Sequence, residues 1–330
     1  MAEKKRSRQS TASAFGWVFQ SSAGLYLLLD CIETATSIKM EGKREDIEIT
    51  LDDNTIIYAQ AKSVENINDR TNNRAKLKRA LESLSDCTES VKKLIYISNI
   101  INPLDSSTHQ QYVYSRTPFS SFLDADKVTV NDILSDIENG ADFQTAKFEL
   151  VTFKFCGEDD NQRYGEVLNK TKEFLAKTVV SESKAQAILT EWKALLMNNN
   201  AQRASMSKAE VLFPLILVTI EHQDLEAKYN EVCKLGMYDE AMQKYADFIR
   251  NAPNKTEYFI RVCGHYDKKY LKIGGDHINE FVQNNWRDYI EEYSVIEKSE
   301  DFLESLIKLI MLATLLKRRT IGSIKGAAKL

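Results

Sequence analysis

The segment EDIEITLDDNTIIYAQAKS, residues 45–63, decides the fold. Two runs rich in Ile, Thr and Tyr, DIEITL (46–51) and TIIYAQAK (55–62), flank an Asp-Asp-Asn sequence. This arrangement predicts two strands joined by a turn. Side chains two residues apart share one face of a strand, so Gln60 and Lys62 point the same way. Because lysine is rarely buried without a partner, we expect a negative group beside Lys62.

Asp46 supplies that negative group. It opens the first strand of the hairpin, and Gln60 and Lys62 end the second, so the three side chains should meet at one edge of the sheet. A carboxylate and an amide oxygen suit a hard cation such as Mg²⁺. A lysine beside the ion can orient or deprotonate water and stabilise charge on a phosphate. The hairpin therefore predicts metal-assisted cleavage of a phosphodiester.

On either side of the hairpin, the first half of the chain alternates between helical and strand patterns. Apolar periodicity and β-rich runs predict a helix over 14–33, a strand over 36–40, a helix over 73–84 and strands over 92–99 and 147–155. Between the last two strands we expect a loop around Pro103 and Pro118.

The pattern of apolar residues changes after Gly157. Residues 160–317 read as successive amphipathic helices with no repeat of fixed period. We therefore expect a disordered basic arm over 1–13, an α/β domain over 14–157 with a mixed sheet flanked by helices, and an all-α domain over 158–330.

Composition narrows the class of protein. With 330 residues, 43% of them hydrophobic, the chain can bury a sizeable core. Its five cysteines form no CxxC pair, which indicates a reducing cytoplasm. No apolar run reaches the ~20 residues of a membrane span, and the basic N-terminus is not followed by the apolar stretch of a secretory signal.

Charge is distributed unevenly. The net charge of −4 argues against a surface that binds polyanions everywhere. Basic residues nevertheless gather in the N-terminal arm, in the tail after residue 316, and on the helix that follows the hairpin, where Arg70, Arg74 and Lys78 recur every four residues. That helix is either a solvated face or a phosphate-contacting face next to Lys62.

Asp46 followed by Gln60-Ala61-Lys62, on a hairpin behind an N-terminal helix, resembles the PD-(D/E)xK nuclease superfamily. The glutamine in place of the second acid is similar to Mrr-like restriction enzymes. The sequences around these residues resemble the nuclease domain of bacterial anti-phage effectors; they are FGWVFQSSAGLYLLL, EGKREDIEI and YAQAKS. Such domains occur in CBASS systems, and in Lamassu-type systems beside an SMC-like ATPase. The resemblance covers residues 14–155 and implies a restriction-endonuclease-like fold.

The resemblance also implies roles for individual residues. Asp46 would be the central metal ligand, Gln60 would fill the second ligand position, and Lys62 would be the catalytic lysine. Gln20 matches the Phe-Gln of the opening motif and would touch the site or the substrate, and Glu41 would be a further acid. Because Gln60 is neutral, metal binding should be weaker than in members with two acids.

The sequence as a whole thus predicts a Mg²⁺- or Mn²⁺-dependent nuclease that cleaves double-stranded DNA with little specificity, with Arg74 and Lys78 as substrate contacts. Such an enzyme must be held inactive. The helical half lacks the alternating helix and strand patterns expected of a cyclic-nucleotide sensor. This favours control by partner subunits, as in Lamassu-type systems, or by homo-oligomerisation. Two alternatives stay open: a nuclease-fold adaptor without metal chemistry, and an RNA or repair nuclease on the same fold.

Other polar and aromatic residues are expected to have structural roles. Glu45 and Glu48 are expected to be solvated charges on the strand face. The Asp-Asp-Asn sequence at 52–54 is expected to form the turn and not to bind metal. The tryptophans Trp17 and Trp192, together with Trp286, are expected to anchor a core or an interface.

Overall fold

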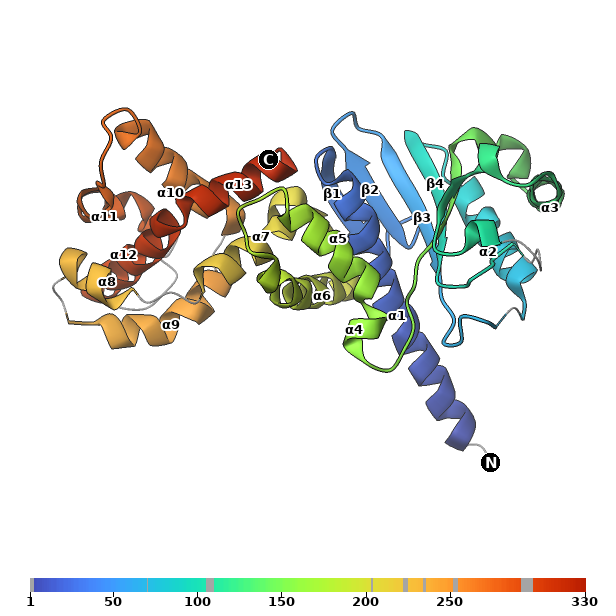
Figure 1. The fold of residues 1–330 in the computed structure, drawn as a ribbon, viewed down its shortest axis with the longest axis horizontal. Helices are drawn as coiled ribbons and strands as arrows, with labels where there is room; N and C mark the ends of the chain where they lie inside the picture. The colour runs from blue at the N-terminus through green and yellow to red at the C-terminus, as the bar shows by residue number, and fades with distance from the viewer. Residues whose placement is uncertain are drawn as a thin grey trace. The chain divides into compact units, whose positions relative to one another are not determined.

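The protein is described by a computed structural model, drawn in Figure 1. The described residues are 3–69, 71–104, 110–202, 204–221, 225–233, 236–251, 255–291 and 299–330. The chain divides into two compact units, which we call the sheet unit and the helical unit. The sheet unit comprises Met1–Glu173 and Leu189–Lys208, and the helical unit comprises Phe174–Ile188 and Ala209–Leu330.

A seven-stranded mixed sheet in the order β5-β6-β4-β3-β2-β1-β7 forms the centre of the sheet unit. The strands are β1 (Ala35–Met40), β2 (Ile47–Leu51), β3 (Ile56–Lys62), β4 (Val91–Ser98), β5 (Arg116–Pro118), β6 (Phe148–Thr152) and β7 (Ser205–Ser207). The expected hairpin is confirmed, because β2 and β3 pair antiparallel. Strand β3 pairs parallel with β4, and β4 pairs parallel with β6.

Helices account for most of the remaining described chain. The α-helices are α1 (Glu3–Cys31), α2 (Asn73–Ser85), α3 (Asp124–Ser135), α4 (Asp160–Arg163), α5 (Gly165–Leu175), α6 (Ala185–Gln202), α7 (Lys208–Ile220), α8 (Glu226–Val232), α9 (Tyr238–Asn251), α10 (Lys255–Tyr270), α11 (Ile278–Asn285), α12 (Glu300–Leu316) and α13 (Arg318–Ala328). Short 3₁₀ turns are η1 (Gln110–Tyr112), η2 (Phe119–Ser121), η3 (Gly140–Asp142), η4 (Thr145–Lys147), η5 (Glu182–Lys184) and η6 (Trp286–Tyr289).

Helices cover both faces of the sheet, with α1 on one face and α2 and α3 on the other (Figure 1). On the α1 face, the ring of Phe19 stacks on Phe153 with centroids 5.3 Å apart. Gly24 lies so close to Met40 that a Cβ there would come within 2.7 Å of the Met40 sulfur. These contacts fix α1 against the strands.

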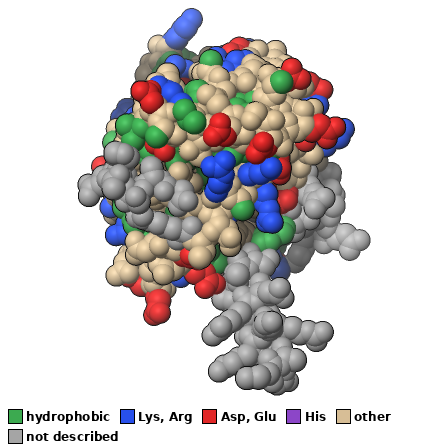
Figure 2. Space-filling view, turned by 90° about the vertical axis from the view of Figure 1, so that its right-hand side faces the viewer, with side chains coloured by type: hydrophobic (Ala, Val, Ile, Leu, Met, Phe, Trp, Pro, Cys, Tyr) green, Lys and Arg blue, Asp and Glu red, His purple; other side chains and the backbone are tan. Residues whose placement is uncertain are grey.

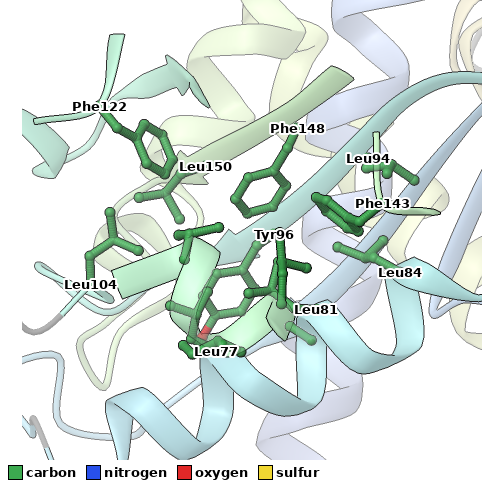
Figure 3. Close-up of a cluster of buried hydrophobic side chains, with 14 of the residues drawn as sticks. Leu77, Leu81, Leu84, Leu94, Tyr96, Leu104, Phe122, Phe143, Phe148 and Leu150 are labelled. Carbon is green, nitrogen blue, oxygen red and sulfur yellow. The ribbon is translucent and has the colours of Figure 1, made fainter. Parts of the chain in front are cut away.

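The opposite face holds an apolar cluster of buried side chains (Figure 3). Leu77, Leu81 and Leu84, spaced along one side of α2, pack on Tyr96 and Phe148 of the sheet. Because β3 is central and covered on both faces, its residues from Ile57 to Gln60 are all buried. A strand covered on both faces shows no alternation of buried and exposed residues over this stretch.

Two expected irregular segments are ordered differently. Helix α1 begins at Glu3 and not near Ala14, so the described part of the expected disordered arm is helical. Good helix formers and the absence of Gly or Pro before Gly16 allow the helix to extend. The loop expected between the strands at 92–99 and 147–155, around Pro103 and Pro118, contains β5 and α3.

The boundary between the two units also differs from the expected one at residue 157. The chain returns to the sheet unit over Leu189–Lys208, where β7 pairs antiparallel with β1. The ammonium of Lys208 then donates to the carbonyl oxygen of Glu33, at 3.0 Å. A three-residue strand inside a helical pattern gave no period-2 signal, which is why the sequence did not predict it.

The helical unit has its own apolar core. Helix α12 runs through it, and from Leu306 to Leu315 every residue of this helix is buried. Helices α8, α9, α10 and α11 all contact α12. Among the described residues, no helix is long and apolar enough to cross a bilayer. The five cysteines carry free thiols.

Candidate active site

The backbone of Asp46 is held at the end of a short irregular segment between β1 and β2. Glu41 opens this segment in the left-handed region, with φ of 48°. Its N–H donates to the carbonyl oxygen of Asp46 at 2.8 Å. The side-chain amide of Gln20, on α1, donates to the same oxygen at 2.9 Å. Two elements distant in sequence therefore fix where the Asp46 side chain starts.

The Asp46 carboxylate meets the end of β3. The pairing of Ile47 with Ala59 places Asp46 opposite Gln60, whose side-chain amide donates to Asp46 Oδ2. The backbone N–H of Ala61 donates to the same oxygen at 3.0 Å. Lys62 Nζ lies 3.8 Å from it. The three side chains that the sequence selected do meet at one end of the sheet.

Asp46 and Lys62 remain accessible at this site. Their side chains keep 24% and 34% of their exposure, whereas the whole of Gln60 keeps 5%. Gln60 is thus buried beside the site, whereas the two charged side chains are partly exposed to solvent. Among the described contacts, all those of the Asp46 carboxylate fall on Oδ2, which leaves Oδ1 for a ligand.

Burial raises the pKa of the Asp46 carboxyl above its ordinary value, and the neighbouring Glu41 charge adds to the rise. The Lys62 ammonium and the Ala61 N–H oppose this shift of the pKa, because both favour the ionised form. Desolvation and the neighbouring donors thus shift the pKa of this carboxyl in opposite directions, and perturbed pKa values are common at functional sites.

Two buried polar residues that the sequence did not single out hold the backbone around Lys62. Ser98 Oγ donates to the carbonyl oxygen of Lys62 at 2.7 Å. Asn99 accepts from the N–H of Val64 at 2.9 Å and donates to the carbonyl oxygens of Val64 and Phe155, both at 2.8 Å. A signal was present: Ser-Asn ends the otherwise apolar run of β4.

Glu45 and Glu48 are not solvated strand-face charges. Glu45 is 4% exposed, and the thiol of Cys87 lies 3.9 Å from its Oε1. Burial raises the pKa of Glu45 to about 8. Glu48 is half-buried and accepts from the N–H of Arg44 at 2.9 Å. Burial alternates without a break from Glu45 to Leu51, so Glu45 lies on the buried face with Ile47 and Ile49, whereas Glu48 lies on the half-buried face.

The other expected residues fall into two groups. The turn prediction for 52–54 is confirmed: Asn54 has φ of 60° and its N–H donates to the carbonyl of Leu51 at 3.0 Å. On α2, Arg74 is exposed and Lys78 is half-buried, and neither makes an ion pair within the described residues. Arg70 lies outside the described residues.

Trp17 differs from the expected core or interface anchor, because 42% of it is exposed. Trp192 and Trp286 are buried as expected. The face in Figure 2, seen from the side on which Figure 1 draws α2 and α3, carries acidic and basic side chains intermingled. This agrees with the net charge of −4 and favours local over global contacts with an anion.

The donor set permits one kind of metal ion. In the described part of the chain, no three His, Cys, Asp or Glu side chains cluster closely enough to form a protein-only metal site. Mg²⁺ is usually bound by one or two carboxylates, with water and substrate phosphate completing its shell. Asp46 supplies a carboxylate for an ion of that type, and Gln60 would join it as a ligand through its amide oxygen once the amide flips, because its nitrogen donates to Asp46 Oδ2 here.

Comparison with known proteins returns few similarities. No family model matches the chain, and no curated protein sequence matches it. Among solved structures, the Moraxella osloensis Cap4 SAVED/CARF-domain containing receptor matches 62% of this chain and 47% of its own, with 17% identity and a TM-score of 0.40. The Acinetobacter baumannii Cap4 receptor with the cyclic trinucleotide 3'3'3'-cAAA matches 62% and 44%, with 13% identity and a TM-score of 0.39.

The chain thus spans less than half the length of these two receptor chains. Similarity at this level carries no argument about the activity or ligand of this protein. The functional interpretation therefore depends on the site itself.

Proposed function

We propose that this protein is a metal-dependent DNA endonuclease of bacterial anti-phage defence. One observation carries the proposal: Asp46, Gln60 and Lys62 meet at the end of the β2–β3 hairpin, and Asp46 and Lys62 stay partly exposed there. An acid, an amide oxygen and an ammonium beside each other are the set that metal-assisted phosphodiester hydrolysis requires.

Each residue has a distinct role in this proposal. Asp46, with the Gln60 amide oxygen, would hold Mg²⁺ or Mn²⁺, which supplies Lewis-acid polarisation of the phosphate when bound. Lys62 would place its ammonium against the phosphate and stabilise the charge that develops during hydrolysis. The Ala61 N–H keeps Asp46 Oδ2 in place. Glu41 would contribute negative charge next to Asp46 and strengthen the hold on the cation.

Contacts to the substrate would be made mainly to the DNA backbone. Gln20 lies behind Asp46, and the exposed Arg74 and the half-buried Lys78 on α2 lie on the helix that follows the hairpin. Phosphate contacts position DNA without reading its sequence. Cleavage of double-stranded DNA should therefore show little sequence preference, and binding should fall steeply with salt.

A nuclease of low specificity needs control. The helical unit would provide the surface for that control, either for partner subunits such as an SMC-like ATPase or for a second copy of the chain. Two copies would place two sites on one duplex.

The test is cleavage of a supercoiled plasmid with Mg²⁺, with and without the products of the neighbouring genes. Lys62→Ala should reduce the rate by roughly 10²- to 10⁴-fold. Lys92→Ala is the matched control, because Lys92 is a half-exposed lysine on β4 that pairs with Asp53 in the hairpin turn. Equal rates for Lys62→Ala and the unmodified protein would remove the site.

A second candidate is an adaptor that keeps the fold without metal chemistry. The neutral Gln60 and the sparse acids favour it. Titration with Mg²⁺ and Mn²⁺ separates the two, since the adaptor binds neither ion. An RNA nuclease would instead be revealed by digesting RNA and DNA of the same sequence.

A further inference from the structure

Trp17 stands apart from the other aromatic residues of α1. The core-facing side of this helix carries Phe15 and Phe19, whose rings lie 5.4 Å from Phe155 and 5.3 Å from Phe153 respectively. Residues two positions apart on a helix point about 160° apart, so Trp17 points away from this core. It is 42% exposed, whereas Phe19 is 1% exposed.

The position of Trp17 connects it to the candidate active site. Gln20, three residues later, donates to the carbonyl oxygen of Asp46 at 2.9 Å. Residues three apart on a helix are surface neighbours, with Cβ atoms ~5–6 Å apart. The exposed indole therefore lies one helical turn from the residue that fixes the metal-binding aspartate.

Upstream of Trp17, the same helix carries a basic run. Lys4, Lys5, Arg6 and Arg8 occupy the first turns of α1. At 1.5 Å per residue, Arg8 lies about 14 Å along the helix axis from Trp17. In sequence order, one helix thus contains a basic run, an exposed aromatic residue and a site contact. Lys62 adds positive charge at the site itself.

Positive charge complements the phosphates of a nucleic acid, and an exposed indole complements the π face of a base. In a paired duplex, neighbouring bases cover those faces. An aromatic side chain therefore stacks on a base only where the duplex is interrupted or single-stranded.

Resting on the proposed nuclease function, we propose that Trp17 stacks on an unpaired base next to the phosphate held at Asp46 and Lys62. The preferred DNA substrate then has a single-stranded overhang, gap or frayed end. A second copy of the chain docked on Trp17 is the competing occupant, and the dependence of the signal on protein concentration distinguishes it.

Tryptophan fluorescence of the full chain provides the test. The chain has three tryptophans, and Trp192 and Trp286 are 0% and 2% exposed, so a ligand on the surface should quench Trp17 emission. The titration uses Asp46→Asn, which should not cleave, with two DNA probes of one sequence: a blunt duplex and a duplex with a single-stranded overhang. We expect strong quenching by the overhang probe and weak quenching by the blunt probe.

Trp17→Phe and Trp17→Ala in the same Asp46→Asn background complete the experiment. Trp17→Ala should weaken binding of the overhang probe by roughly 5- to 100-fold, which is the value of one stacked base. Trp17→Phe should retain part of that affinity but lose the quenching. Trp286→Phe is the matched control, because it removes a buried tryptophan and should leave the quenching intact.

Several outcomes would overturn the base contact. Equal quenching by both probes, or none, contradicts it, and so does an emission change that depends on protein concentration without DNA, which indicates self-association through Trp17. Failure of the nuclease proposal looks different. In that case the overhang probe still quenches Trp17, but the unmodified protein cleaves no DNA with Mg²⁺.

Discussion

Buried polar side chains serve different purposes in the two units. In the sheet unit they join residues far apart in sequence: Gln20 reaches Asp46 across 26 positions, and Asn99 reaches Val64 across 35. Their contacts converge on the end of the sheet that carries Lys62. Burying polar groups costs desolvation free energy, so several buried polar groups at one place indicate a functional site.

In the helical unit, half of the described buried polar side chains bond within their own helix. Thr219, Asn285 and Thr314 each donate to the carbonyl oxygen four residues earlier in their own helix. The longer contacts, made by Thr256, Ser305 and Lys308, join α10 to α7 and α12 to α8 in the core of this unit. Local hydrogen bonds satisfy a buried hydroxyl without positioning another group.

The comparison teaches that function should be sought where buried polar contacts converge, and it predicts different consequences for the same kind of substitution in the two units. The largest effect is expected at Asp46. Asp46→Asn keeps the shape of the side chain but removes the charge that would hold the cation, so the Mg²⁺-dependent cleavage rate should fall by about 10³- to 10⁴-fold. Plasmid cleavage at saturating Mg²⁺ measures it.

The control for this variant is Asp53→Asn, the same change in the turn at the other end of the hairpin. Asp53 lies about 17 Å from the site by the rise of a five-residue strand. Its carboxylate caps the turn, accepting from the N–H of Thr55 at 2.9 Å, and pairs with Lys92 at 3.1 Å. Comparable losses in both variants would show that the hairpin needs its charges for folding and not for cleavage.

The next effect concerns stability at Glu45, which precedes Asp46. Burial raises its pKa from 4.5 to about 8, so between these values the folded state keeps a proton that the unfolded state has lost. The free energy of unfolding should therefore fall as the pH rises through this range and change no further above pH 8. At ~1.36 kcal/mol per pKa unit, the fall between pH 5 and pH 8 is about 3 to 4 kcal/mol.

Glu45→Gln should remove this dependence, because the amide is neutral at every pH. Urea denaturation at pH 5, 6.5 and 8 measures it, and the variant should be the more stable protein at pH 8. Glu82→Gln, at an exposed position of α2, is the control and should change the free energy of unfolding by less than about 0.5 kcal/mol. Parallel pH profiles for Glu45→Gln and the unmodified protein would contradict the burial of an ionisable group here.

Asn99→Ala should have a smaller effect on stability but a combined effect on function. The substitution leaves buried backbone groups of Val64 and Phe155 without partners, which costs about 2 to 3 kcal/mol. Because Asn99 also fixes the chain that follows Lys62, kcat for cleavage should fall while the affinity for Mg²⁺ stays unchanged. Asn139→Ala removes an exposed amide and should change neither quantity. A purely structural role for Asn99 would lower stability and leave kcat intact.

The sequence predicted the part of the site that local pattern determines. A turn sequence between two β-rich runs sets the register of β2 and β3, and this register alone brings Asp46 opposite Gln60. Lys62 follows two residues later on the same face.

The missed features depend on residues distant in sequence. Glu45 continues the face of Ile47 and Ile49, but its cover on that face includes Cys87, 42 positions later. The importance of Asn99 becomes visible only when Phe155 is brought beside it by the pairing of β4 with β6. The strand β7 owes its existence to the free edge of β1. Periodicity carries no information about such contacts.

The smallest effect is expected in the helical unit. Thr314 is fully buried in α12, and its hydroxyl donates to the carbonyl oxygen of Ile310 at 2.7 Å. Thr314→Val keeps the shape of the side chain, and the Ile310 carbonyl keeps its helical N–H partner, so no buried group is left unpaired. The free energy of unfolding should change by less than about 1 kcal/mol, and the cleavage rate should not change. If this variant folded normally but lost cleavage, the helical unit would hold part of the site, and convergent polar contacts would no longer distinguish the two units.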